Sequence, residues 1–113
     1  MLIRRAQVPE VAEPENALML RELVRSEETS GDVSVTWVRL SGRHRRLRSV
    51  RSTRVYYVLT GSARFAVRDE EPVEAHAGDA VVIPRGAAYE IEGELTYLVV
   101  NGPGFVVGDD QYL

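Results

Sequence analysis

Two stretches punctuated by glycine and proline hold the side chains best suited to chemistry in this chain. Arginine binds carboxylates and phosphates through paired, charge-assisted hydrogen bonds, and a tyrosine hydroxyl can move a proton. The first stretch reads Gly42, five residues, Arg48, one residue, Val50, three residues, Arg54, six residues and Gly61. The second reads Gly78, five residues, Pro84, one residue, Gly86, two residues, Tyr89, three residues and Gly93.

The composition excludes several other chemistries. The 113 residues include no cysteine, and all 14 basic residues are arginine. This excludes disulfide scaffolds, thiolate catalysis and cysteine-ligated metal centres, and also lysine Schiff bases and a P-loop lysine. The net charge of −3 argues against bulk affinity for nucleic acid or anionic membranes. No apolar run approaches the roughly 18 residues needed to span a bilayer, so we expect a cytoplasmic protein without nucleic-acid or membrane partners.

The elements that position these residues are predicted to be short strands. β-Branched and aromatic residues alternate with polar ones, and turn residues recur at short intervals, which is typical of an all-β barrel or sandwich. Residues 15–26 fit either a helix or a buried strand, and the β-rich remainder favours a strand. The remaining predicted strands are 32–40, 54–60, 63–67, 73–76, 80–83, 89–91 and 95–100, with a hairpin at Gly61-Ser62.

The positions of five turn residues resemble the two signature motifs of the cupin superfamily. The matching residues are Gly42, Gly61, Gly78, Pro84 and Gly86. The resemblance implies an all-β, double-stranded β-helix or jelly-roll barrel with a ligand pocket, usually as a homodimer. It divides the single domain into an N-terminal arm with the first strand or strands (1–30), packed on the domain or on a partner subunit, and a barrel (31–113).

The metal ligands of the family are replaced in this chain. Cupins usually place two histidines and a glutamate where this sequence has Arg48, Val50 and Arg54, and a third histidine where it has Tyr89. Gly93 stands where asparagine is usual. Arginine repels divalent cations, and none of the four side chains is a preferred ligand of iron, manganese, nickel or zinc. We therefore expect no metal and no cofactor.

The replacement of metal ligands by cations suggests a ligand-binding role. Arg48 and Arg54 can hold a small anionic or carbonyl-rich molecule directly, with Val50 and Trp37 beside it. Alternatively, the arginines pair with glutamates such as Glu90 or point outward. Trp37 can line the pocket, fill the barrel or lie in a dimer interface, and the sequence leaves these alternatives open.

Two tyrosines are candidates for proton transfer. By alternation, Tyr56 shares the inward face of Arg54, and Tyr89 stands at the position of the third histidine. An arginine nearby can lower the pKa of a phenol, which makes both tyrosines candidate acid–base groups beside Arg54. The alternative is that both are ordinary aromatic core residues.

Histidines and the arginine-rich segment are interpreted as surface features. His44 and His76 match no ligand position, and two histidines alone make a weak metal site. Residues 43–54 contain six arginines in twelve residues, but no aromatic residue is interleaved among the cations, so nucleic-acid binding is not favoured. We expect a solvated loop, partly paired with the acidic residues Asp69, Glu70, Glu71 and Glu74.

Three functions follow from these observations. The first is a metal-independent, non-redox enzyme (an isomerase, epimerase, cyclase or dehydratase) of a biosynthetic pathway, in which Arg54 and Arg48 stabilise developing negative charge and Tyr89 or Tyr56 moves the proton. The second is a noncatalytic small-molecule binding or regulatory protein. The third, a metal-dependent dioxygenase, is contradicted by the replaced ligands. The fold by itself does not choose among them.

Overall fold

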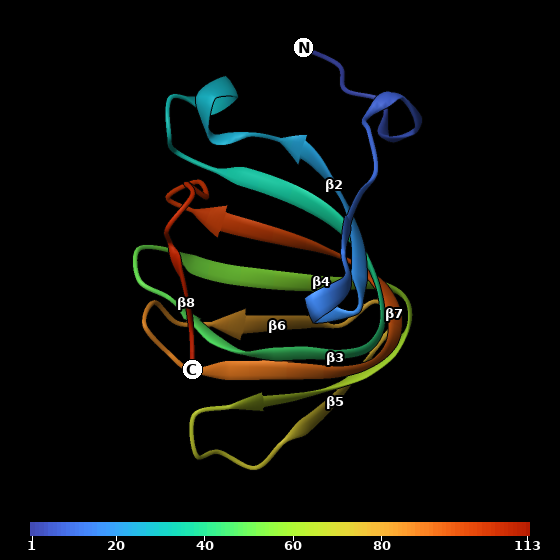
Figure 1. Ribbon diagram of the computed structural model, residues 1–113, viewed down its shortest axis with the longest axis vertical. Helices are drawn as coiled ribbons and strands as arrows, with labels where there is room; N and C mark the ends of the chain where they lie inside the picture. Colours follow the sequence, from blue (N-terminus) through green and yellow to red (C-terminus); the bar gives the residue numbers. More distant parts are fainter.

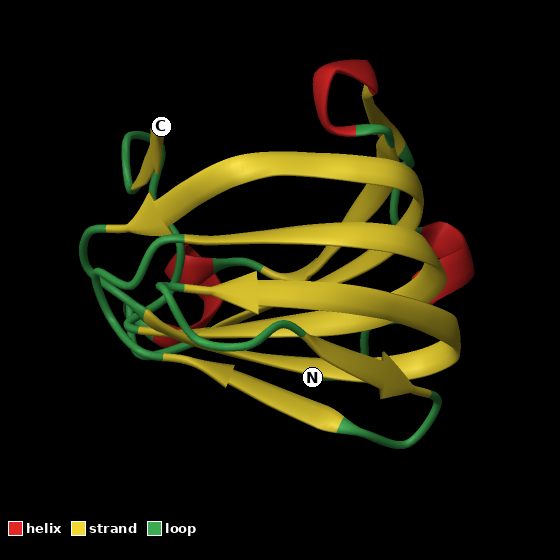
Figure 2. Ribbon diagram, turned by 90° about the horizontal axis from the view of Figure 1, so that it is seen from below, coloured by secondary structure: helices red, strands yellow, loops and turns green.

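The computed structural model describes residues 1–113, and its long regular elements are all β-strands (Figures 1 and 2). The predicted all-β class is confirmed. The strands are β1 (Val11–Glu13), β2 (Leu18–Val24), β3 (Ser34–Ser49), β4 (Thr53–Val67), β5 (Val73–His76), β6 (Ala80–Ile83), β7 (Tyr89–Gly102) and β8 (Asp110–Tyr112). Three short 3-10 turns complete the chain: η1 (Arg5–Gln7), η2 (Pro14–Asn16) and η3 (Ser26–Thr29). None of these turns is long or apolar enough to cross a membrane.

One antiparallel sheet contains all eight strands. Its order is β1-β2-β3-β7-β4-β5, with β6 also paired to β4 and β8 to β3. The three long strands β3, β7 and β4 lie side by side in the middle, and Figure 1 shows them curving together at the right of the molecule. The sheet therefore rolls over on itself, and each long strand contributes to both sides of the barrel.

The bend follows a row of small residues across the three long strands. Gly42 on β3 faces Gly93 on β7, which faces Ala63 on β4. A Cβ at Gly93 would lie 2.5 Å from the carbonyl oxygen of Ser62, so only glycine permits this close approach. The row divides the barrel into two layers. The first layer holds β1, β2, β6 and residues 34–41, 53–60 and 95–102; the second holds β5, β8 and residues 43–49, 64–67 and 89–92.

Three predicted strand boundaries are wrong because the long strands bend and continue where they were expected to end. Gly61, predicted to reverse the chain, instead bends a strand that continues, so segments 54–60 and 63–67 are both part of β4. Segments 89–91 and 95–100 are likewise joined in β7, and β3 continues to Ser49 through the expected loop. The prediction of a strand within residues 15–26 is confirmed by β2.

The core lies between the two layers. Inward residues alternate along the long strands, and fully buried examples are Leu40, Val58, Phe65 and Ile91. Trp37 has the opposite orientation, because it alternates with the inward-facing Val38, and it packs on the outside of the sheet. The guanidinium carbon of Arg5, from the N-terminal arm, lies 5.0 Å from the Trp37 ring centroid.

Candidate active site

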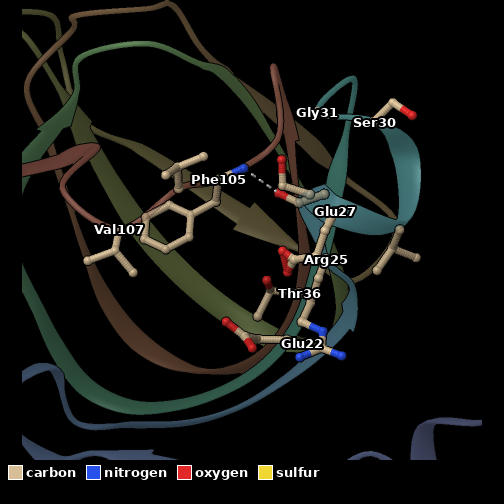
Figure 3. Close-up of a pocket in the computed structure, with 12 residues that line it drawn as sticks. Glu22, Arg25, Glu27, Ser30, Gly31, Thr36, Phe105 and Val107 are labelled. Carbon is tan, nitrogen blue, oxygen red and sulfur yellow. Dashed lines mark hydrogen bonds between the residues drawn. The ribbon is translucent and has the colours of Figure 1, made fainter.

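A cavity of about 360 Å³ opens between the two layers, and the buried polar side chains His44, Arg54 and Asn101 line it. We call it the inner cavity. It is lined by Val11, Glu13, Leu18, Leu20, Glu22, Thr36, Val38, His44, Arg54, Tyr56, Tyr97, Val99, Asn101, Phe105 and Asp110. A neighbouring outer pocket of about 590 Å³ shares Glu22, Thr36 and Phe105 with it. Figure 3 shows Phe105 and Val107 on one side of the outer pocket, facing Glu22, Arg25 and Glu27 on the other.

The first-layer wall of the inner cavity is built from cross-strand rows. Arg54 on β4 pairs in register with Asn101 on β7, and the next inward residues along these strands are Tyr56 and Val99, which are also register partners. Since successive side chains of a strand alternate between its faces, both rows point to the same side of the sheet. The Arg54–Asn101 row is therefore polar, and the next row, Tyr56–Val99, is aromatic and apolar.

Arg54 is the centre of a buried hydrogen-bond relay. Its Nη1 donates to the Tyr89 hydroxyl at 2.8 Å, and its Nη2 donates to Asp110 Oδ1 in an ion pair. The hydroxyls of Tyr89 and Tyr56 lie 2.5 Å apart. Because Tyr89 accepts from Arg54 and lies outside the cavity, its own hydrogen is satisfied by donation to Tyr56. This direction leaves the Tyr56 hydroxyl free to donate a hydrogen to a molecule in the inner cavity.

Burial dominates the protonation of the two tyrosines. It raises the pKa of Tyr89 despite the opposing effect of Arg54, and it raises the pKa of Tyr56 well above the ordinary value. The expectation that arginine lowers a phenol pKa here is therefore wrong, because desolvation of the phenolate outweighs the cation. Burial also opposes the charge of Arg54, but Tyr89, Tyr56 and Asp110 outweigh it and raise the pKa of the guanidinium. The relay thus consists of neutral phenols and a permanent cation.

His44 lies in the inner cavity as a neutral base. Its Nδ1 is 2.9 Å from the backbone carbonyl oxygen of Arg45, and a carbonyl only accepts, so Nδ1 carries the hydrogen and Nε2 keeps a lone pair. Burial lowers the pKa of His44, while Glu13 and Asp110 oppose this and Arg54 reinforces it. His44 is therefore unprotonated at neutral pH. The expectation that His44 lies on the surface is wrong, whereas His76 is exposed as expected.

The sequence and the fold identify the family. The family model of the EutQ-like cupin domain matches residues 27–99. The chain belongs to the EutQ-like cupins. No match is found among curated proteins.

Solved structures show the same cupin barrel at low sequence identity. Pac13 from Streptomyces, described as a unique nucleoside dehydratase, has a TM-score of 0.86 at 19% identity, covering 100% of this chain and 90% of Pac13. A His-to-Gln variant of Pac13 solved with uridine has a TM-score of 0.85 at 18% identity, covering 99% of this chain and 89% of that one. A Trp-to-Tyr variant of oxalate decarboxylase from Bacillus subtilis has a TM-score of 0.81 at 23% identity, covering 96% of this chain and 31% of that enzyme.

The usual metal site of cupins does not fit the residues of this barrel. Of the four equivalent positions, Arg54 and Tyr89 form the relay, Arg48 is absent from the inner cavity, and Val50 is exposed. Nowhere do three histidine, cysteine, aspartate or glutamate side chains converge as a ligand set. The guanidinium of Arg54 supplies a fixed positive charge and hydrogen-bond donors, but it cannot donate a lone pair to a metal.

Several predicted site residues lie elsewhere. Arg48, Val50 and Trp37 do not line the inner cavity, since Arg48 lies beside the inward Leu47 and Ser49, and Trp37 packs on the outside. The six arginines of residues 43–54 belong mostly to strands, and none pairs with the cluster Asp69, Glu70, Glu71 and Glu74; their partners include Glu90, Asp109 and Asp110.

Three site residues are not found by the sequence patterns used above. Counting by twos from Leu40 through Gly42 reaches His44, so alternation would have found it had β3 been extended. Asn101 follows by the same count from Tyr97. Asp110 comes from the end of the chain, and only the pairing of β8 with β3 brings it to Arg54.

The charges of the inner cavity disfavour an anionic ligand. Glu13, Glu22 and Asp110 line it together with a single guanidinium, that of Arg54. Arg54 is already paired with Asp110, so no free positive charge remains for a carboxylate or phosphate. A neutral molecule rich in hydroxyl or carbonyl groups fits this arrangement better.

Proposed function

We propose that this EutQ-like cupin is a metal-independent lyase that removes water from a small hydroxylated carbonyl compound of nucleoside type. One observation carries the proposal: an unprotonated His44 and a hydrogen-donating Tyr56 line the same inner cavity. A base and an acid facing one substrate are what elimination of water requires. The barrel shared with Pac13, a nucleoside dehydratase, supports this choice among non-redox reactions.

His44 is the proposed base. A carbonyl beside a C–H bond makes that proton acidic, and Nε2 of His44 takes it. The electron pair of the C–H bond forms the new carbon–carbon double bond, and the C–O bond of the neighbouring hydroxyl breaks. The hydroxyl leaves as water with the proton of Tyr56, and the proton held by His44 then returns to Tyr56 through solvent.

Tyr56 is the proposed acid, and the rest of the relay positions it. Tyr89 donates to the Tyr56 oxygen, so it stabilises the phenolate that forms when Tyr56 gives up its proton. Arg54 donates to Tyr89 and spreads its positive charge toward the developing anion, while Asp110 holds the guanidinium in place. In this proposal the relay residues donate the proton and stabilise the phenolate without a metal ion.

The experiment is a turnover assay on chelator-treated protein. Uridine derivatives with a carbonyl on the sugar are incubated with the enzyme, and loss of one water is followed by mass spectrometry. We expect turnover in the presence of chelator. His44→Gln should lower kcat by about 100- to 1000-fold, within the range for a general base, while the exposed-site control His76→Gln should retain it.

The same assay separates the enzyme from a binding protein. Binding of uridine without any water loss would favour the alternative, a noncatalytic small-molecule binding or regulatory cupin. Loss of turnover on chelation, restored by a divalent metal, would contradict the metal-independent proposal. A cytoplasmic location and a place in a biosynthetic pathway are part of the proposal, since the reaction tailors a small metabolite.

A homodimer is also proposed, formed through the outer face of the first layer. Four valines make one row across neighbouring strands, Val35–Val100–Val55–Val82. Outer faces of antiparallel sheets are usually polar where they meet water. A two-fold axis that lies in the plane of this outer face brings the row against its own copy, which gives the matched contact of an isologous dimer. The exposure of Val82 (60%) and Tyr57 (44%) supports an occupant for this face.

Sedimentation at micromolar concentration tests the dimer. Val82→Arg places a charge in the proposed interface and is expected to give a monomer. Val73→Arg is the matched control, because Val73 is similarly exposed (50%) but lies on β5 of the second layer. A monomeric wild-type protein, or dissociation of both variants alike, would contradict the proposal.

A further inference from the structure

Two buried polar atoms of the inner cavity have no hydrogen-bond partner. They are Nε of Arg54 and Oδ1 of Asn101, on residues only 5% and 4% exposed. The other buried side-chain atoms without a partner belong to residues outside this cavity: Arg21, Trp37 and Arg48. Since an unsatisfied buried polar group is costly, a pair of them on residues that line one cavity points to a ligand.

These two atoms belong to neighbouring residues and have complementary hydrogen-bonding character. Arg54 and Asn101 are register partners on β4 and β7, and both point inward. The Cβ atoms of such cross-strand partners lie about 4.5–5.5 Å apart. Nε of Arg54 carries a hydrogen and only donates, whereas Oδ1 of Asn101 only accepts. A group that both accepts and donates satisfies the two atoms together.

A hydroxyl group is the chemical group that fits. Its oxygen accepts from Arg54 and its hydrogen is donated to Asn101. A carboxylate or phosphate has no hydrogen for Asn101 and would meet the charge of Asp110, which already pairs with Arg54. A carbonyl leaves Asn101 unsatisfied, and an ammonium group has no lone pair for Arg54.

Arg54 also links this position to the proposed acid. Its Nη1 is 2.8 Å from the Tyr89 hydroxyl, which is 2.5 Å from the Tyr56 hydroxyl. Arg54 and Tyr56 line the same cavity, so the hydroxyl held at Nε of Arg54 and the hydroxyl that meets Tyr56 belong to one bound molecule. We infer that the inner cavity recognises a vicinal diol, and that Asn101 with Arg54 holds the hydroxyl that is retained while the other leaves.

The part of the substrate attached to the diol can extend from the inner cavity toward the outer pocket, next to the row that contains Asn101 and Arg54. Ser34, the other register partner of Asn101, accepts a hydrogen bond from the backbone N–H of Phe105 at 2.9 Å. Phe105 lines both the inner cavity and the outer pocket, where Figure 3 shows its ring. A group attached to the diol can extend past this ring into the outer pocket. This inference rests on the proposed function for the identity of the leaving hydroxyl only.

Binding of three matched probes tests the diol. The probes are uridine, 2′-deoxyuridine and 3′-deoxyuridine, measured by calorimetry with the full chain. Wild-type protein should bind uridine about 10- to 100-fold more tightly than at least one deoxy probe, as expected for a lost hydrogen bond to a charged group. Asn101→Leu removes the acceptor at similar size and should abolish the preference.

Two further variants keep the test decisive if Asn101→Leu folds poorly. Asn101→Asp retains an acceptor beside Arg54 and should keep the preference for uridine. His76→Gln lies on the exposed strand β5, outside the inner cavity and the outer pocket, and should also keep it. Equal affinity for the three probes, no binding of any probe, or a preference unchanged in Asn101→Leu would overturn the inference.

The readouts separate this inference from the proposed function. A preference that depends on Asn101 without any turnover upholds diol recognition and contradicts the dehydratase. Turnover of sugar-carbonyl derivatives that is insensitive to Asn101→Leu upholds the dehydratase and contradicts diol recognition.

Discussion

The two layers of the barrel share three long strands but present opposite outer faces. In the first layer the outward residues of β3, β7, β4 and β6 form the valine row and, next to it, a row that ends in Leu98, Tyr57 and Ala80. In the second layer the same three long strands place Arg43, Glu92 and Arg64 side by side. The outer face of the second layer is charged and suited to solvent. The outer face of the first layer resembles the core of a protein interface, which is poor in charge and includes tyrosine.

The inner faces differ in a way that matters for chemistry. The first layer contributes Arg54, Tyr56 and Asn101, and the second contributes His44, Tyr89 and Asp110. The relay crosses the gap between the layers three times, from Arg54 to Asp110, from Arg54 to Tyr89 and from Tyr89 to Tyr56. Neither layer contains a complete site, so the proposed chemistry depends on the bend that brings the layers together.

The largest expected effect comes from blocking the bend. Gly61 and Gly86 have nearly the same backbone angle (φ +77° and +78°), but a Cβ at Gly61 would collide with the carbonyl oxygen of Glu94, whereas Gly86 faces open space. Gly61→Ala should cost more than about 3 kcal/mol in the free energy of unfolding, and Gly86→Ala about 1–2 kcal/mol. Urea denaturation measures both. Equal losses would mean that close packing of the strands is unimportant here.

The contact between the layers at Arg54 is expected to matter next. Asp110→Asn keeps the side-chain shape but leaves the buried guanidinium without its anion, at a cost of about 2–3 kcal/mol. Arg51→Gln breaks the neighbouring, more exposed pair with Asp109 and should cost about 1 kcal/mol or less. Denaturation curves of the two variants compare the pairs directly, and a larger loss for Arg51→Gln would reverse the ranking.

A pH dependence of stability should arise from His44 of the second layer. In the unfolded chain His44 titrates near its ordinary pKa of 6.5, whereas burial lowers its pKa in the folded protein. As the pH falls below 6.5, the unfolded chain gains a proton first, so the free energy of unfolding decreases until the lowered pKa is reached. His44→Gln should flatten this part of the profile. An identical profile in wild type and variant would rule out the buried neutral imidazole.

The smallest effect is expected on the charged outer face of the second layer. Arg43 lies 2.6 Å from Glu90, but its side chain is 64% exposed. Arg43→Gln should therefore change the free energy of unfolding by about 0.5 kcal/mol or less, with a further decrease of the effect in high salt. Thermal denaturation of wild type and Arg43→Gln at two salt concentrations measures this change. A loss comparable with that of Asp110→Asn would show that this face is also a structural contact.

The cupin fold and part of the site could be predicted from local pattern. Glycine and proline at set intervals indicated the barrel, and alternation placed Arg54 and Tyr56 on one inward face, as the structure has them. Both signals depend on residues close together in the chain, because side chains alternate with a period of two along any strand. The replacement of the metal ligands was also visible from residue types alone.

The tertiary structure decided the rest, because it depends on contacts between distant segments. Whether Gly61 reverses the chain or bends it depends on the neighbouring β7, and the same pairing extends β3 to bring His44 inward. Asp110 is 56 residues away from Arg54 in the chain, and only the pairing of β8 with β3 brings the two together. The pKa values of Tyr56 and Tyr89 also depend on distant contacts. Burial raises them more than the nearby Arg54 lowers them, and this burial arises only when the two layers close.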